Sequence, residues 1–226
     1  MWVGRIGNVA AIRARSELYL YPRLSPDDTR LAINIGRAEF GGGEIWILDF
    51  ARDTLSRFER GIMPLWTPDG SAITYSNTLQ GAVPNIVQQS LDGRDRPEPL
   101  TDNEHITVPL SWASDGNRLL IEELRPDTLR VLDLETREVN LMLSSPANER
   151  PGSLSPDGAW IVYASDETGE REIYVQAFPG PGRTQQVSTD GGTEPLWARN
   201  GREIFYRSGD KMMVVPVSTE PELNLT

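Results

Sequence analysis

The sequence contains no cysteine, one lysine (Lys211) and one histidine (His105). Without cysteine, the chain has no disulfide bond, thiolate metal ligand or cysteine nucleophile, and either a reducing or an oxidising compartment would suit it. No run of about 18 apolar residues occurs, which argues against a membrane-spanning helix. The first residues lack a basic leader followed by an apolar stretch, so a signal peptide is absent or already removed.

The charge balance is acidic, with 33 acidic and 22 basic residues and a formal net charge of −11. An acidic surface repels phosphate backbones and anionic lipid headgroups, and no cluster of arginines offsets it here. We therefore expect neither nucleic-acid binding nor membrane insertion. Such acidity is typical of a well-solvated surface.

One turn motif recurs five times along the chain. It is Ser/Thr-Pro-Asp-Gly or a close variant, and steps of 42, 46, 42 and 43 residues separate its last positions: Asp28, Gly70, Gly116, Gly158 and Gly201. Four residues before each last position stands a large apolar residue: Leu24, Trp66, Trp112, Leu154 and Trp197. Branched or aromatic residues follow three and five positions after it, which is the periodicity of a strand. Because Pro, Asp and Gly favour tight turns, each motif predicts a hairpin between an inner strand and its neighbour.

Two further strands complete each repeat. The third strands are expected at 44–50, 85–91, 128–134, 172–178 and 212–217, and short fourth strands follow, for example at 137–141 and 184–187. Four strands in roughly 43 residues is the pattern of a propeller blade, and no segment has a sustained helical period. A β-sandwich also has short strands, but it would not repeat its turn at a fixed long spacing. The sequence therefore predicts an all-β fold, a β-propeller of four-stranded antiparallel blades.

The repeats resemble those of TolB-like, WD-repeat-like β-propellers. Residues 154–161, their variant at 24–31 and the stretch 44–49 carry this resemblance. Residues 155–206 are also similar to propellers that lie C-terminal to some bacterial serine/threonine protein kinases. The resemblance implies a propeller over the whole chain and a bacterial scaffold or sensor module. The resemblance is specific for the fold and much less specific for function, because propellers host many unrelated activities. A cytoplasmic and an extracytoplasmic location both stay open.

We expect a single domain over 1–226, with blade repeats at 21–60, 63–103, 108–149, 150–192 and 194–226. Residues 2–12 read as a third and a fourth strand, since Trp2-Val3 aligns with Trp46-Ile47, while the last repeat supplies only three strands. The sequence therefore predicts that residues 1–15 add the missing outer strand and close a five-bladed ring. The resemblance usually implies six blades, which is the alternative. A short propeller and a piece of a longer protein both stay open.

Constellations for catalysis are scarce. A serine hydrolase would need a Gly-x-Ser-x-Gly elbow and a base, and the chain has no such elbow. The Asp-Gly turns lack the spacer of sialidase aspartate boxes and are interpreted as hairpin turns. His105, near Asp102 and Glu104, is a conceivable metal ligand, but no second histidine completes a cage, so a solvated loop residue is favoured. No cofactor or metal is expected.

One end of the predicted ring collects the loops between blades and the loops between second and third strands. Polar and charged residues gather there, and we interpret them as a peptide-binding or small-ligand-binding face: Tyr21, Arg60, Glu104, His105, Glu149, Arg150, Asp166, Arg171 and Glu194. The tryptophans at 66, 112 and 197 occupy inner-strand positions and are predicted to pack between blades rather than to stack on sugars.

The leading hypothesis is a non-enzymatic, monomeric module that binds a protein or peptide. Two alternatives stay open: a small metal-dependent hydrolase or lyase with its site at the channel mouth, and a structural fragment whose activity lies in another domain.

Overall fold

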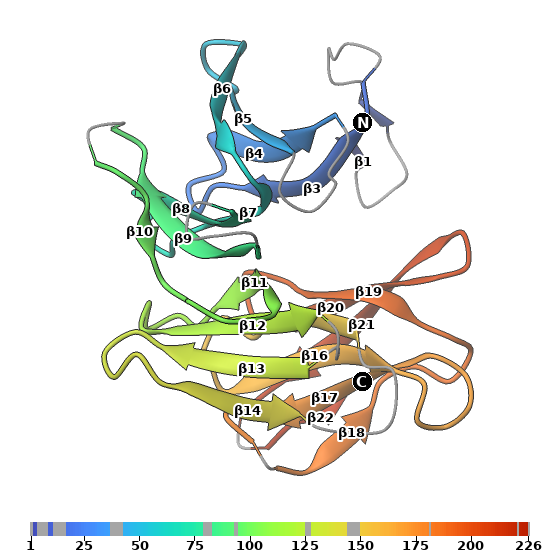
Figure 1. Ribbon diagram of the computed structural model, residues 1–226. Helices are drawn as coiled ribbons and strands as arrows, with labels where there is room; N and C mark the ends of the chain where they lie inside the picture. Colours follow the sequence, from blue (N-terminus) through green and yellow to red (C-terminus); the bar gives the residue numbers. More distant parts are fainter. Residues whose placement is uncertain are drawn as a thin grey trace.

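The computed structural model describes residues 2–3, 9–10, 17–36, 43–78, 83–92, 95–124, 128–143, 150–180, 182–220 and 222–225 (Figure 1). These residues form strands, turns and loops, and they contain no helix. Within this part of the chain, therefore, nothing could cross a membrane as a long apolar helix.

Five antiparallel sheets of four strands each form the blades of a propeller, and in each blade the strands lie in chain order. Blades 1 and 2 comprise β3 (Tyr19–Leu24), β4 (Arg30–Ile35), β5 (Glu44–Asp49) and β6 (Thr54–Arg60), then β7 (Ile62–Trp66), β8 (Ala72–Asn77), β9 (Asn85–Ser90) and β10 (Glu98–Pro99). Blade 3 comprises β11 (Ile106–Trp112), β12 (Arg118–Leu124), β13 (Thr128–Asp133) and β14 (Val139–Leu143). Blades 4 and 5 comprise β15 (Arg150–Leu154), β16 (Trp160–Ser165), β17 (Glu172–Ala177) and β18 (Thr184–Gln186), then β19 (Thr193–Trp197), β20 (Glu203–Ser208), β21 (Lys211–Ser218) and β22 (Asn224–Leu225). The predicted all-β, five-bladed propeller is confirmed.

The repeated turn joins the first and second strands of every blade, as the sequence predicted. Its last residue adopts the left-handed backbone region in all five blades, with φ between 58° at Asp28 and 71° at Gly201. Glycine accepts this conformation without steric cost, which explains why it ends the motif in four blades. Asp28 is the exception, because a short polar side chain tolerates this region better than most.

Among the described residues, four hydrophobic clusters lie between or across neighbouring blades. One spans blades 1 and 2 around Tyr75, one spans blades 2 and 3 around Ile121, one extends from Ile62 through blade 3 to Tyr163, and one joins blades 4 and 5 around Trp197. Trp66 and Trp197 are buried in these clusters and Trp112 is half-buried, so the predicted packing role of the tryptophans is confirmed. Each blade is thus stabilised mainly by its neighbours, as in other repeat proteins.

The predicted closure of blade 5 by the N-terminal strand is wrong. The outer strand of blade 5 is its own β22, which pairs with Val217 and Ser218 of β21. At the N-terminus, β1 (Trp2–Val3) pairs instead with β2 (Val9–Ala10) in a separate two-stranded sheet. The prediction failed because β22 is only two residues long (Asn224–Leu225), which is too short to carry a periodic signal in the sequence.

Candidate binding surfaces

The strand directions divide the ring into two ends. The first strand of each blade runs from the end that carries the blade-to-blade links to the end that carries the repeated turns. We call the first the linker face and the second the turn face. Every described candidate binding residue comes from a link, from a loop between second and third strands, or from the start of a first strand, and therefore belongs to the linker face.

The candidate residues differ in how exposed their side chains are. Tyr21, Arg60, Glu104, His105 and Glu194 are exposed. Asp166 and Arg171 are half-buried, Arg150 is described only as the first residue of β15, and Glu149 lies outside the described residues. Arg207 forms an ion pair with Glu194 at 3.4 Å.

Every first strand is interrupted by a β-bulge next to a proline, a feature that the sequence analysis did not use. The register shifts in β3, β7, β11, β15 and β19, and each shift includes or adjoins Pro22, Pro64, Pro109, Pro151 or Pro195. In three blades the residue before the proline is left-handed: Tyr21 (φ 52°), Met63 (φ 55°) and Glu194 (φ 53°). Bulges redirect side chains. A residue other than glycine is strained in the left-handed region, and strained residues of this kind are found most often at binding and active sites. The fivefold spacing of these prolines could have revealed the bulges.

Buried polar side chains hold the links of the linker face in place. The Asn34 amide donates to the carbonyls of Gly61 (2.8 Å) and Glu44 (3.2 Å), and its oxygen accepts from Met63 N (2.9 Å). In blade 4, Glu172 accepts a hydrogen bond from Ser188 Oγ and another from Gly191 N at 3.0 Å. These residues position the links rather than face a ligand. The sequence pattern gave no sign of them, because their partners lie in other strands or in loops that are distant in sequence.

On the turn face, an aspartate side chain organises four of the five repeated turns, and Asn200 takes its place in blade 5. Asp27 Oδ1 accepts from Ser25 Oγ (2.6 Å), Thr29 N (3.1 Å) and Thr29 Oγ1 (2.8 Å), and these hydrogen bonds lower the pKa of Asp27 to about 2. Hydrogen bonds from the Ser71 backbone and from the Thr67 and Ser71 hydroxyls lower the pKa of Asp69 as well. The motif is therefore structural, as the sequence indicated.

These shifts predict loss of stability in acid. A carboxyl group whose folded pKa lies below its unfolded value stabilises the fold above about pH 4, and this contribution disappears as the pH falls toward the folded value. We expect the urea midpoint to decline between about pH 4 and pH 2, and to decline less steeply in Asp27→Asn, whose amide does not titrate. Equal slopes for the wild type and the variant would contradict this account of the turn.

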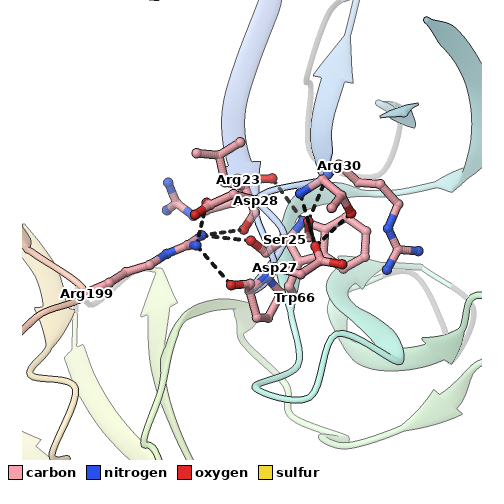
Figure 2. Close-up of polar contacts among 10 residues, drawn as sticks. Arg23, Ser25, Asp27, Asp28, Arg30, Trp66 and Arg199 are labelled. Carbon is pink, nitrogen blue, oxygen red and sulfur yellow. Dashed lines mark hydrogen bonds and ion pairs between the residues drawn. The ribbon is translucent and has the colours of Figure 1, made fainter. Parts of the chain in front are cut away.

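Arg199 joins blade 5 to blade 1 across what we call the seam, the space between the last and the first blade (Figure 2). Its guanidinium donates to the carbonyls of Leu24 (3.2 Å), Ser25 (2.9 Å) and Pro26 (3.2 Å), and it pairs with Asp28 Oδ1 at 2.5 Å. Both charged side chains are more than half exposed, so the ion pair itself contributes little to stability.

The seam is also where the repeat changes. At each of the other four junctions, the glycine of one turn packs near the second residue of the preceding turn: Pro26 with Gly70, Pro68 with Gly116, Ser114 with Gly158 and Pro156 with Gly201. At the seam, Arg199 occupies the position of the proline and Asp28 that of the glycine. A long charged side chain therefore spans a junction at which, in the other blades, two neighbouring turns lie close together.

No described side chains assemble a metal site. Among the residues that the structure describes, no three His, Cys, Asp or Glu residues lie close enough to hold an ion. His105 is exposed, and its carbonyl accepts from Thr107 Oγ1 at 3.0 Å. Two grooves of roughly 420 and 350 Å³ indent the described surface; the first lies on the turn face between Asp69 and Asp115, and the second lies between the outer parts of blades 4 and 5.

Comparisons with known proteins agree with this architecture. A putative TolB from Agrobacterium tumefaciens has a TM-score of 0.75 over 93% of this chain and 81% of that chain, at 18% identity. TolB from Acinetobacter baumannii has a TM-score of 0.70 over 92% of this chain and 54% of that chain, at 21% identity. An uncharacterized peptidase of Bacillus subtilis, YuxL, is 28% identical over 152 residues, which are 65% of this chain but only 22% of the relative. A family model for the TolB beta propeller domain matches residues 50–225, and the chain therefore belongs to the TolB β-propeller domain family.

Proposed function

We propose that this propeller is a non-enzymatic module that binds a segment of a protein or peptide on its linker face. The observation that carries the proposal is the repeated bulge near this end of the first strands. Left-handed Tyr21 and Glu194 stand at matching positions in blades 1 and 5, and both side chains are exposed. Strain repeated at equivalent positions needs a compensating role, and recognition of a ligand is the usual one.

The shape and charge of the surface favour an extended partner over a small molecule. Small ligands prefer enclosed, mostly apolar cavities, whereas several candidate side chains of the linker face are exposed and charged. Arg60, Glu104 and Glu194 present charges of both signs at this end. A mixed, exposed set of charges suits a polar peptide and sets its orientation more than its affinity.

The peptidase relative does not change this proposal. The matched stretch is 22% of its length, and the present sequence has no nucleophile elbow. No described cluster of side chains favours the metal-dependent alternative.

The proposal predicts that neutralising the linker face abolishes peptide binding. A peptide selected from a displayed random library against the wild-type chain should bind at least tenfold more weakly to Arg60→Ala/Glu104→Ala/Glu194→Ala, as measured by titration calorimetry. A tenfold loss corresponds to about 1.4 kcal/mol, within the range of a few lost polar contacts.

The matched control is Arg52→Ala/Glu135→Ala/Glu138→Ala. It removes the same charges from exposed positions near the turn face, so net charge is the same in both variants. If the two triple variants bind the peptide equally, or if no peptide is selected, the linker face is not the binding surface.

A further inference from the structure

The groove on the turn face between blades 2 and 3 is lined by a tryptophan and two aspartates. Its volume is roughly 420 Å³, and its lining includes Trp112, Asp69, Asp115, Gln88 and Gly116. Trp112 is half-buried, whereas the two aspartates are exposed. The face of an indole ring attracts a cation, and carboxylates strengthen this attraction. The lining therefore favours a positively charged ligand.

The equivalent place between blades 1 and 2 is filled by an arginine of the chain itself. Arg30 stands two residues after the repeated turn of blade 1, and Trp66 ends the first strand of blade 2. The guanidinium carbon of Arg30 lies 4.8 Å from the centre of the Trp66 ring, and Nη2 donates to the carbonyl of Gly70 at 3.4 Å. The geometry is that of a cation–π contact supported by a hydrogen bond. Two neighbouring blades of this repeat therefore form a guanidinium site.

Between blades 2 and 3, the chain does not supply this guanidinium. Ala72 occupies the position of Arg30, Trp112 that of Trp66 and Gly116 that of Gly70. The side chain of Ala72 ends at Cβ and cannot reach over the indole. Among the residues that the structure describes, no arginine or lysine lies over the Trp112 ring. The groove thus keeps the tryptophan and the turn of the guanidinium site and lacks only the cation.

The next two junctions fill the same position with a large side chain. Between blades 3 and 4 it is Arg118, whose guanidinium carbon lies 5.4 Å from the centre of the Phe178 ring. Between blades 4 and 5 it is Trp160, which packs against the cluster that contains Trp197. Ala72 is the small residue of the series, and a gap at this position forfeits packing contacts. A guanidinium from outside the chain would restore them.

We propose that this groove binds the guanidinium group of an arginine side chain from a partner polypeptide. The planar group stacks on the Trp112 ring, as the guanidinium of Arg30 does on Trp66, and an N–H group donates to the carbonyl of Gly116. Arginine suits the site better than lysine, because its flat, delocalised cation both stacks and donates hydrogen bonds. The inference concerns the turn face and does not depend on the linker face.

The two aspartates of the groove contribute mainly negative charge. Asp69 already accepts hydrogen bonds from Thr67 and Ser71, and Asp115 pairs with Arg118 at 2.7 Å. They attract a cation without forming a dedicated clamp for it. The net charge of −11 draws a basic segment toward the surface in the same way. Free arginine gains less from this field, because its own carboxylate is repelled.

The test uses N-acetyl-arginine amide as the probe and the wild-type chain labelled with ¹⁵N. The indole N–H signal of Trp112, identified by its loss in Trp112→Phe, should shift saturably, with a dissociation constant on the order of millimolar, as suits a single side chain. N-acetyl-citrulline amide has nearly the same shape but no charge, and it should bind at least fivefold more weakly because the cation–π contact is lost. Free arginine should bind no more tightly than the capped probe.

Two substitutions move the guanidinium into or out of the chain. Ala72→Arg should abolish the shift, because its side chain would cover Trp112 as Arg30 covers Trp66. Ala51→Arg, at an exposed alanine between β5 and β6, adds the same charge and should change the affinity less than twofold. Arg30→Ala should open a second site, so that the indole signal of Trp66 also shifts with the probe. This second variant decides the question even if Ala72→Arg does not fold.

Several results would overturn the proposal. They are no saturable shift at Trp112, equal binding of the arginine and citrulline probes, equal effects of Ala72→Arg and Ala51→Arg, or no new shift at Trp66 in Arg30→Ala. Free arginine that binds more than fivefold more tightly than the capped probe would overturn the polypeptide partner. So would self-association of the wild type that Ala72→Arg abolishes, since the arginine would then belong to a second copy. The Arg60/Glu104/Glu194 triple variant should bind this probe normally, which separates failure of the groove from failure of the linker face.

Discussion

Replacing Trp197 with alanine should lower the free energy of unfolding by about 3–5 kcal/mol, the range typical of a buried large aromatic residue. Trp197 is 4% exposed and packs with Val175, Ile204 and Tyr206 between blades 4 and 5. Its removal leaves a cavity between two sheets whose strands are fixed by their own hydrogen-bond ladders, so the cavity cannot collapse. Urea unfolding followed by circular dichroism measures the effect.

Met212→Ala is the control for Trp197→Ala. It removes another large apolar side chain from blade 5, but one that is 69% exposed. Its effect should stay within about 0.5 kcal/mol. A loss below about 1 kcal/mol for Trp197→Ala would show that the junction between blades 4 and 5 is not a main source of stability.

The second large effect is expected for Asn34→Ala, which should lower the free energy of unfolding by about 2–3 kcal/mol. The substitution leaves the backbone amide of Met63 and the carbonyl of Gly61 without their side-chain partner at a buried junction. An unsatisfied buried polar group costs about 1–3 kcal/mol, and two groups lose a partner here. Urea unfolding again provides the measurement.

Asn34→Asp tests the direction of these hydrogen bonds. A carboxylate still accepts from Met63 N, but it cannot donate to the carbonyls of Gly61 and Glu44 and would repel them. The variant should therefore be destabilised at pH 7 and should recover relative to the wild type as the pH falls below about 4, where a protonated carboxyl can donate. Asn140→Ala, at an exposed position on β14, should have little effect. A harmless Asn34→Ala would contradict the assigned role.

The repeat made most of the fold predictable from the sequence. Five turns at a nearly constant spacing located the first and second strands, and the alternation beyond each turn, as at Ile161 and Tyr163, identified the residues that become buried. Local side-chain chemistry determines these features, because a turn needs particular residues and a strand needs alternation. Blade number, sheet order and the packing of Trp66 and Trp197 followed from them.

The features that the sequence did not reveal depend on contacts between distant segments. The two residues of β22 acquire strand structure only by pairing with β21, and the polar role of Asn34 exists only because Gly61 lies beside it. The seam was unforeseen for the same reason. In the sequence, Arg199 and Asp28 each look like a minor departure from the motif. The structure shows that the two residues form an ion pair with each other across the seam. For the candidate binding face, the sequence indicated which residues belong to it, but it did not predict the β-bulges in the first strands.

The prolines of the first strands limit how another polypeptide can pair with the inner edges of the blades. A first strand is the innermost edge of its blade, and an exposed edge ordinarily invites an additional strand. Proline has no N–H to donate, and a bulge breaks the regular ladder, so each of the five inner edges is a poorer template for strand addition than a regular edge would be. The same irregularity makes it harder for the inner edges of two chains to pair with each other and start aggregation.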